Sequence, residues 1–214
     1  MQGLLIVLDG IDGSGTTTQA RLLQETFLRA GLPAHLTQEP SDGPVGHVIR
    51  DALSGRLVVK GLAGVRPPGW ATMALLFAAD RLDHLDAEIV PNLADGIHVI
   101  CDRYVHSSLV YQSVSSGDDA NLRWIEEINR RARRADLTLV LDVEPKTAAE
   151  RRMRRQGRRE MYDDTDLQVR LAARYRELPA RYPDERIEIV DGKRDADSVH
   201  KDCWDATRRL RDER

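Results

Sequence analysis

The chain has 214 residues, of which 31% are charged and 41% are hydrophobic, and its formal net charge is −3. This length suits one domain with a sizeable core and is short for two. The charge balance lacks the basic signature of a nucleic-acid-binding protein, and no apolar run approaches the ~20 residues that cross a bilayer. The opening "MQGLLIVLDG" lacks the basic start of a signal peptide. We therefore expect a cytoplasmic protein that binds neither nucleic acid nor membranes.

Five short apolar runs alternate with helical patterns along the chain. The runs, mostly continuous rather than alternating, are 4–8, 34–38, 97–101, 137–143 and 186–190. The helical patterns cover 22–30, 71–89, 120–134, 165–182 and about 195–211. Such an alternation predicts an α/β fold, a doubly wound parallel five-stranded sheet with helices on both faces.

Two details of this pattern are specific enough to be tested. The expected core stripe of the second helix runs through Ala71, Ala74, Leu75, Ala78, Leu82, Leu85 and Ile89. The Gly- and Pro-rich "GLAGVRPPGW" (61–70) is interpreted as a loop, too short to divide the chain into domains. We therefore expect a single domain over residues 1–214.

The stretch "GIDGSGTTTQ" follows the first run and opens the first helix, which is the setting of a phosphate-binding loop. Gly10 and Gly15 occupy the two glycine positions and Thr17 the Ser/Thr position that binds Mg²⁺. Thr16 stands where such loops carry the lysine that reaches the β- and γ-phosphates. The pattern predicts a P-loop NTPase-type fold, and a plain tight turn is the structural alternative.

Polar residues follow two other strands, at the edge of the sheet where doubly wound folds bind ligands. Asp102 and Arg103 follow the third run; an exposed ion pair is the alternative to a role with Mg²⁺ and phosphate. The segment 39–53 follows the second run and carries Arg50. Phe77 and Arg81, four residues apart, share a helix face and can stack on a base and bond to its edge; a core Phe beside a surface Arg is the alternative.

Together these motifs resemble the thymidylate kinase family, which phosphorylates deoxynucleoside monophosphates. The resemblance covers nearly the whole chain, in order. It rests on "LDGIDGSGTTTQ", "QEPSDGPVGHVIR", "LLFAADRLDH", "CDRYVHSSLVYQ", "LVLDVEP", the Arg-rich "RRMRRQGRRE" and "IEIVDG". It implies a nucleoside monophosphate kinase-like domain with an Arg-rich lid over about 150–163, ATP and Mg²⁺ as cofactors, dTMP as acceptor, and a homodimer that packs through helices of the 71–90 type.

The resemblance also implies roles for acceptor-site residues. Asp12 would hold the sugar 3′-hydroxyl and help to order the metal. Arg50 and Arg103 would bind the acceptor phosphate, and Phe77 would stack on thymine. Tyr111 would exclude a 2′-hydroxyl. The remaining acceptor residues, expected at the base edge or in the loop after the second strand, are Arg81, Ser107, Ser108, Gln112, Glu39 and Pro40.

On the donor side, the resemblance implies that Thr17 and Asp102 serve Mg²⁺. The phosphate loop would contribute Gly10, Ile11, Asp12, Gly13, Ser14, Gly15, Thr16, Thr17 and Thr18. Arg154, Arg158 and Arg159 would close over ATP from the lid. Arg151 or Arg152, with Lys193 in the loop 191–194, would border the adenine.

Two cations of the family pattern are missing. Thr16 replaces the loop lysine, and Met161 stands where the lid of the family often has an Arg. Because this chemistry depends on charge neutralisation, we hypothesise that Arg158 or Arg159 compensates. The leading interpretation is a dTMP kinase. The alternatives are a kinase for another deoxypyrimidine monophosphate, a catalytically degenerate nucleotide-binding homologue, and, more weakly, a nucleic-acid binder that uses the Arg clusters.

Overall fold

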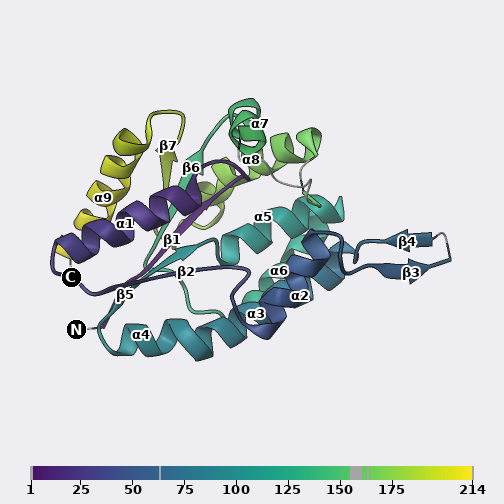
Figure 1. The fold of residues 1–214 in the computed structure, drawn as a ribbon, viewed down its shortest axis with the longest axis horizontal. Helices are drawn as coiled ribbons and strands as arrows, with labels where there is room; N and C mark the ends of the chain where they lie inside the picture. The colour runs from purple at the N-terminus through teal and green to yellow at the C-terminus, as the bar shows by residue number, and fades with distance from the viewer. Residues whose placement is uncertain (1, 63, 155–160, 163, 214) are drawn as a thin grey trace.

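The computed structural model describes residues 2–62, 64–154, 161–162 and 164–213. Its main sheet has five parallel strands in the order β2-β5-β1-β6-β7 (Figure 1). The strands are β1 (Leu5–Gly10), β2 (Ala34–Gln38), β5 (His98–Asp102), β6 (Leu137–Asp142) and β7 (Ile187–Asp191). Each corresponds to one of the apolar runs of the sequence, so the predicted five-stranded sheet is confirmed.

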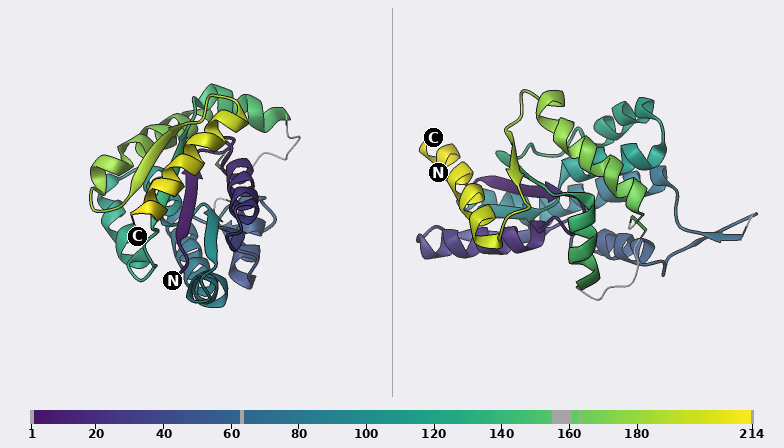
Figure 2. Two further views of the ribbon diagram at one scale, coloured as in Figure 1. Left: turned by 90° about the vertical axis from the view of Figure 1, so that its left-hand side faces the viewer. Right: turned by 90° about the horizontal axis from the view of Figure 1, so that it is seen from above.

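Helices connect the strands and cover the sheet (Figures 1 and 2). They are α1 (Thr16–Arg29), α2 (Pro44–Leu53), α3 (Trp70–His84), α4 (Val90–Ala94), α5 (Val105–Ser116), α6 (Leu122–Asn129), α7 (Pro145–Arg154), α8 (Thr165–Arg181) and α9 (Ala196–Asp212). A π-helical turn η1 (Leu85–Ile89) joins α3 to α4, and a 3₁₀ turn η2 (Asp119–Asn121) precedes α6. In the described part of the chain, no helix is long and apolar enough to span a bilayer.

The central strand β1 shows why helices lie on both faces. Its side chains alternate between the two faces of the sheet. Ile6 and Leu8 pack in one cluster with residues of α1 and α9, whereas Leu5 and Val7 pack against η1 and α4. All four are fully buried, as expected for a strand inside a parallel sheet covered on both sides.

The core stripe predicted for the helix over 71–89 is partly wrong. Leu75 is 52% exposed and Leu82 is 38% exposed, whereas Met73, Ala74 and Arg81 are buried. The prediction turned the apolar side chains of this helix toward the core and assumed that an arginine would not be buried there. The helix is instead rotated so that Arg81 enters a buried polar network, and this rotation turns the two leucines outward.

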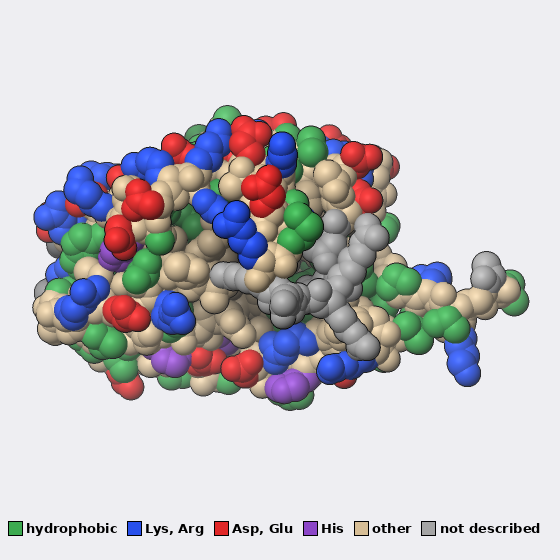
Figure 3. Space-filling model, turned by 45° about the horizontal axis from the view of Figure 1, so that its top comes forward, with side chains coloured by type: hydrophobic (Ala, Val, Ile, Leu, Met, Phe, Trp, Pro, Cys, Tyr) green, Lys and Arg blue, Asp and Glu red, His purple; other side chains and the backbone are tan. Residues whose placement is uncertain are grey.

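Two further expectations need correction. The segment 61–70 is not simply a loop: β3 (Val59–Gly61) and β4 (Gly64–Arg66) form an antiparallel hairpin that projects from the body of the molecule (Figures 1 and 3). Both strands are exposed along their whole length. The sequence therefore has no pattern of buried apolar residues from which these strands could be predicted. The helix expected over 120–134 ends at Asn129, because no apolar stripe continues through the arginine run that follows.

Candidate active site

The loop between β1 and α1 has the shape of an anion cradle. Gly13 and Gly15 have φ angles of 86° and 105°, which L-residues rarely adopt. A Cβ on Gly13 would lie 2.4 Å from the carbonyl oxygen of Ala148 on α7, whereas a Cβ on Gly15 would meet nothing within 4 Å. One glycine therefore permits close packing of α7, and the other leaves open space in front of the N-terminus of α1. A helix N-terminus that opens onto such space attracts phosphate.

Thr17 and Asp102 lie together behind this cradle. The Thr17 hydroxyl donates to Oδ2 of Asp102 over 2.5 Å. The other carboxylate oxygen, Oδ1, is buried and has no hydrogen-bond partner among the described residues. Hydroxyl and carboxylate oxygens suit Mg²⁺, which usually takes few protein ligands and completes its shell with water and substrate phosphates. The described residues contain no cluster of three or more His, Cys, Asp or Glu that could hold a metal.

Arg103 connects the end of β5 to the phosphate loop. Its Nη2 donates to Oδ1 of Asp12 over 2.7 Å, and its Nη1 donates to the Gly10 carbonyl over 2.9 Å. Its φ of 71° is unusual for a residue with a side chain. The backbone N–H of Arg103 bonds to the Leu8 carbonyl, and the Cys101 thiol donates to the Arg103 carbonyl. Such strain held by the surroundings is typical of functional sites.

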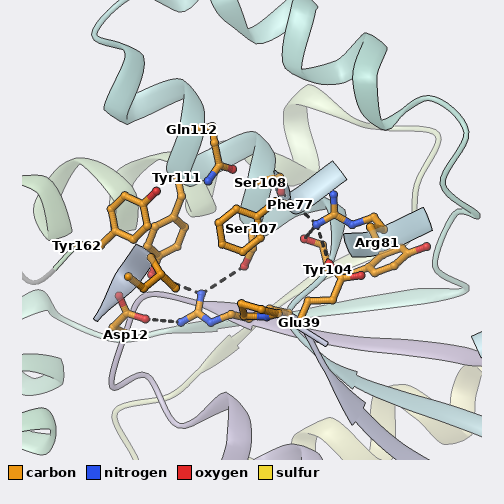
Figure 4. Close-up of a pocket in the computed structure, with 13 residues that line it drawn as sticks. Asp12, Glu39, Phe77, Arg81, Tyr104, Ser107, Ser108, Tyr111, Gln112 and Tyr162 are labelled. Carbon is orange, nitrogen blue, oxygen red and sulfur yellow. Dashed lines mark hydrogen bonds and ion pairs between the residues drawn. The ribbon is translucent and has the colours of Figure 1, made fainter. Parts of the chain in front are cut away.

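Arg103 lines a cavity of ≈ 150 Å³. Figure 4 shows this cavity with its lining residues. Residues far apart in the sequence line it: Asp12, Glu39, Pro40, Leu53, Phe77, Arg81, Arg103, Tyr104, Ser107, Ser108, Tyr111, Gln112 and Tyr162. The structure thus brings together every predicted acceptor residue except Arg50. Arg50 instead donates to the Pro40 carbonyl over 2.9 Å and pairs with Asp42, so it borders the loop that forms one wall.

The cavity combines flat rings with buried polar groups, as a base-binding pocket requires. Phe77 is half-buried at the wall, and Tyr111 packs edge-on to Tyr162 at a centroid distance of 5.1 Å. Gln112 is 1% exposed, and its Oε1 has no partner within the described part of the chain. Burial raises the pKa of the Tyr111 hydroxyl far above its usual value, so this hydroxyl is neutral.

Arg81 is held at the far side of the pocket by a buried network. Its Nη2 donates to Glu39 Oε2 over 2.7 Å and to Ser108 Oγ over 3.0 Å, and its Nη1 donates to Asn129 Oδ1. The Arg81 and Glu39 side chains are 1% and 2% exposed. Arg81 is therefore buried, and the alternative interpretation, in which Arg81 is an ordinary surface residue, is wrong. His84 is also buried and lies 3.5 Å from Glu39.

Behind Arg103 lies Asp9, for which the sequence predicted no role. Ser107 donates to Asp9 Oδ1, and the Tyr175 hydroxyl lies 3.3 Å from the same oxygen. Burial raises the pKa of Asp9 from 3.8 to about 6. The sequence feature that could have drawn attention to Asp9 is its position: it is a carboxylate at the end of the apolar run "LLIVLD", directly before Gly10.

The pH dependence of the unfolding free energy should reveal the buried carboxyl group of Asp9. Because the folded state binds a proton on Asp9 between about pH 4 and pH 6 that the unfolded state releases, this proton stabilises the fold and is lost as pH rises. We expect the unfolding free energy of wild type, relative to Asp9→Asn, to fall by about 2 kcal/mol from pH 4 to pH 7. Urea unfolding of both proteins across this range measures the difference. Parallel curves would contradict the prediction.

A second cavity, of ≈ 390 Å³, opens on the other side of the phosphate loop. It is lined by Gly13, Ser14, Gly15, Thr18, Gln19, Arg151, Arg154, Gly192, Arg194, Asp195, Ala196 and Val199. Lys193 lies outside this lining, and its Nζ pairs with Glu144 over 3.2 Å. The lid residues Arg158 and Arg159 lie outside the described residues.

Comparison with known proteins agrees with this geometry. The family model for thymidylate kinase matches residues 8–203. The thymidylate kinase of Ruegeria pomeroyi is 42% identical, over 94% of this chain and 92% of that protein. The probable thymidylate kinase of Pyrococcus horikoshii is 39% identical over 94% of both chains, and the thymidylate kinase of Pelotomaculum thermopropionicum is 38% identical over 99% and 96%. The chain belongs to the thymidylate kinase family.

Proposed function

We propose that this protein transfers the γ-phosphoryl group of ATP to dTMP, giving dTDP and ADP, and that it does so with Mg²⁺. The observation that carries the proposal is the position of the two cavities. Asp12 lines one and its neighbour Gly13 lines the other, so the cavities meet at the phosphate loop. A donor on one side and an acceptor on the other would bring their phosphates together at this point, which is what direct transfer requires.

The first cavity suits a deoxypyrimidine monophosphate. Phe77 offers a ring for stacking on the base, while Arg81 and Gln112 place polar groups toward its edge. Tyr111 would crowd the sugar where a ribonucleotide has its 2′-hydroxyl. Asp12 would accept a hydrogen bond from the 3′-hydroxyl, and Arg103 would bind the acceptor phosphate with its planar fork.

The second cavity suits ATP. The phosphate loop from Gly10 to Thr18 would bind the phosphates through its N–H groups, and Arg151 and the loop 191–194 would border the adenine. Thr17 and Asp102 would hold Mg²⁺, directly or through water. When bound, the metal neutralises negative charge on the phosphate oxygens of the donor.

The residues of the chain then act by position and charge rather than by covalent chemistry. An oxygen of the acceptor phosphate bonds to the γ-phosphorus, and the bond from that phosphorus to the bridging oxygen breaks. The electron pair leaves with that oxygen on ADP. Arg103 stabilises the acceptor side of this transfer, and no side chain has to remove a proton, because the acceptor phosphate is already ionised.

Formation of dTDP from ATP, Mg²⁺ and dTMP tests the proposal directly. Separate reactions with dUMP and dCMP compare the acceptors, and a reaction without Mg²⁺ serves as a control. Binding of ATP is measured in parallel by calorimetry. Preference for dTMP supports the proposal, and preference for another acceptor assigns a different substrate. ATP binding without product from any acceptor would mark a nucleotide-binding homologue and overturn it.

We further propose that residues 1–214 act as one kinase domain and that two copies associate. Leu75 and Leu82, seven residues apart on α3, are exposed, and Val90 on α4 is 45% exposed. Exposed apolar side chains along one helix suit burial against a second copy. We also place the protein in the cytoplasm, where reducing conditions keep thiols such as Cys101 and Cys203 unpaired.

The dimer proposal gives a direct prediction. Wild type is expected to show twice the chain mass by light scattering, whereas the double variant Leu75→Asp/Leu82→Asp is expected to show the mass of one chain, because charge on this face opposes its burial. Val169→Asp, at a 52% exposed position on α8, serves as the matched control. A wild type that stays monomeric at high concentration would contradict the prediction.

A further inference from the structure

The missing loop lysine leaves a gap in the positive charge around the transferred group. Thr16 occupies the lysine position, is 6% exposed and carries no charge. The rest of the first turn of α1, Thr17 to Gln19, contains no basic residue either. A cation that replaces the lysine must therefore come from another element that reaches the loop.

Helix α7 supplies such a cation. Arg152 lies across the loop, with its Nη1 donating to the Asp12 carbonyl over 2.5 Å. Its Cγ would be 3.0 Å from a Cβ on Gly13, and the Ala148 carbonyl of the same helix would be even closer. Gly13 is therefore what allows α7, and with it the Arg152 side chain, to lie against the phosphate loop.

Two nearby arginines, Arg151 and Arg103, bind other groups. Arg151 donates to the Ser14 carbonyl over 3.3 Å and to the Gly192 carbonyl over 3.0 Å, so it faces the loop at the adenine end of the second cavity. Arg103 binds the Asp12 carboxylate on the acceptor side. Arg152 contacts Asp12 and Gly13, the two residues at which the acceptor and donor cavities meet.

We propose that Arg152 takes the place of the phosphate-loop lysine and stabilises the charge on the γ-phosphoryl group during its transfer. This inference rests on the proposed dTMP kinase activity. As the γ-phosphorus–oxygen bond to ADP breaks and the bond to the acceptor oxygen forms, negative charge spreads over the phosphoryl oxygens. A guanidinium held against Asp12 and Gly13 can donate two hydrogen bonds to these oxygens, which a lysine ammonium cannot do in the same planar geometry.

The experiment compares wild type, Arg152→Ala, Arg152→Lys and the double variant Thr16→Lys/Arg152→Ala. Turnover of ATP and dTMP and the affinity for ATP without acceptor are both measured. We expect Arg152→Ala to lower kcat on the order of a thousandfold, the magnitude of an arginine finger, and to weaken ATP binding only about tenfold. Arg152→Lys should retain part of the rate, and Thr16→Lys should restore most of it. Arg208→Ala, which removes an exposed arginine from α9, is the control for charge alone.

The outcomes separate this inference from the proposed function. Wild type that makes no dTDP refutes the dTMP kinase activity itself. Active wild type with equally active Arg152→Ala refutes only the role of Arg152. Equal losses of kcat in Arg152→Ala and Arg152→Lys would also overturn it, since a replacement cation must help. The double variant can fail to fold, because Thr16 is buried. In that case the comparison of Arg152→Ala with Arg152→Lys still tests the proposal.

Discussion

Replacing Arg103 with glycine is expected to lower kcat/KM for dTMP about a thousandfold or more while the protein stays folded. The guanidinium binds both Asp12 and the Gly10 carbonyl, so its loss removes the charge that would bind the acceptor phosphate. The partner carboxylate of Asp12 is 34% exposed and is therefore hydrated when Arg103 is absent. Steady-state kinetics with dTMP varied, together with a thermal melt, measure both effects.

The backbone of Arg103 makes the choice of substitution informative. At a φ of 71°, glycine is unstrained, whereas alanine carries a penalty of about 1 kcal/mol. Arg103→Ala should therefore be as inactive as Arg103→Gly but less stable by about that amount. Arg103→Lys keeps the charge and loses the fork, so it should recover only part of the activity. Wild-type kcat/KM in Arg103→Gly would show that Arg103 does not bind the acceptor.

The sheet could be predicted from the sequence because parallel strands are buried on both faces. Continuous apolar runs such as "LLIVL" and "LTLVLDV" are needed for that burial, and they coincide with β1 and β6 to within about two residues. The exposed hairpin β3–β4 could not be predicted in this way, because its strands bury nothing and hence impose no pattern on the sequence.

The grouping of residues around the first cavity could be predicted to a similar extent, for a related reason. Motifs at the ends of parallel strands meet at one edge of the sheet, so Asp12, Glu39 and Arg103 were expected to lie together, and they do. Tyr104 and Tyr162 were missed as pocket residues because they reach the cavity only through tertiary packing. No local spacing relates Arg81 to Asn129, 48 residues away, although their side chains share a buried hydrogen bond.

In the proposed function, Arg81 has two roles that a single substitution cannot separate. It lines the cavity proposed to bind the base, and it pairs with Glu39 inside the protein. We expect Arg81→Met to destabilise the fold by about 3–5 kcal/mol, because the Glu39 carboxylate would remain buried without its charged partner. Urea unfolding at pH 7 measures this loss. A loss below about 1 kcal/mol would show that the pair is not essential to the fold.

The double variant Glu39→Gln/Arg81→Met separates the structural role from the binding role. With the buried carboxylate removed, the unfolding free energy should recover by at least half of what Arg81→Met loses, since removing both charges costs far less than stranding one. Affinity for dTMP should stay low, because the guanidinium that faces the base is still absent. Recovery of both stability and dTMP affinity would mean that Arg81 serves only to neutralise Glu39, and base recognition would then fall to Phe77 and Gln112. Calorimetric titration of the folded double variant and of wild type with dTMP shows whether the affinity for dTMP is lost or recovered.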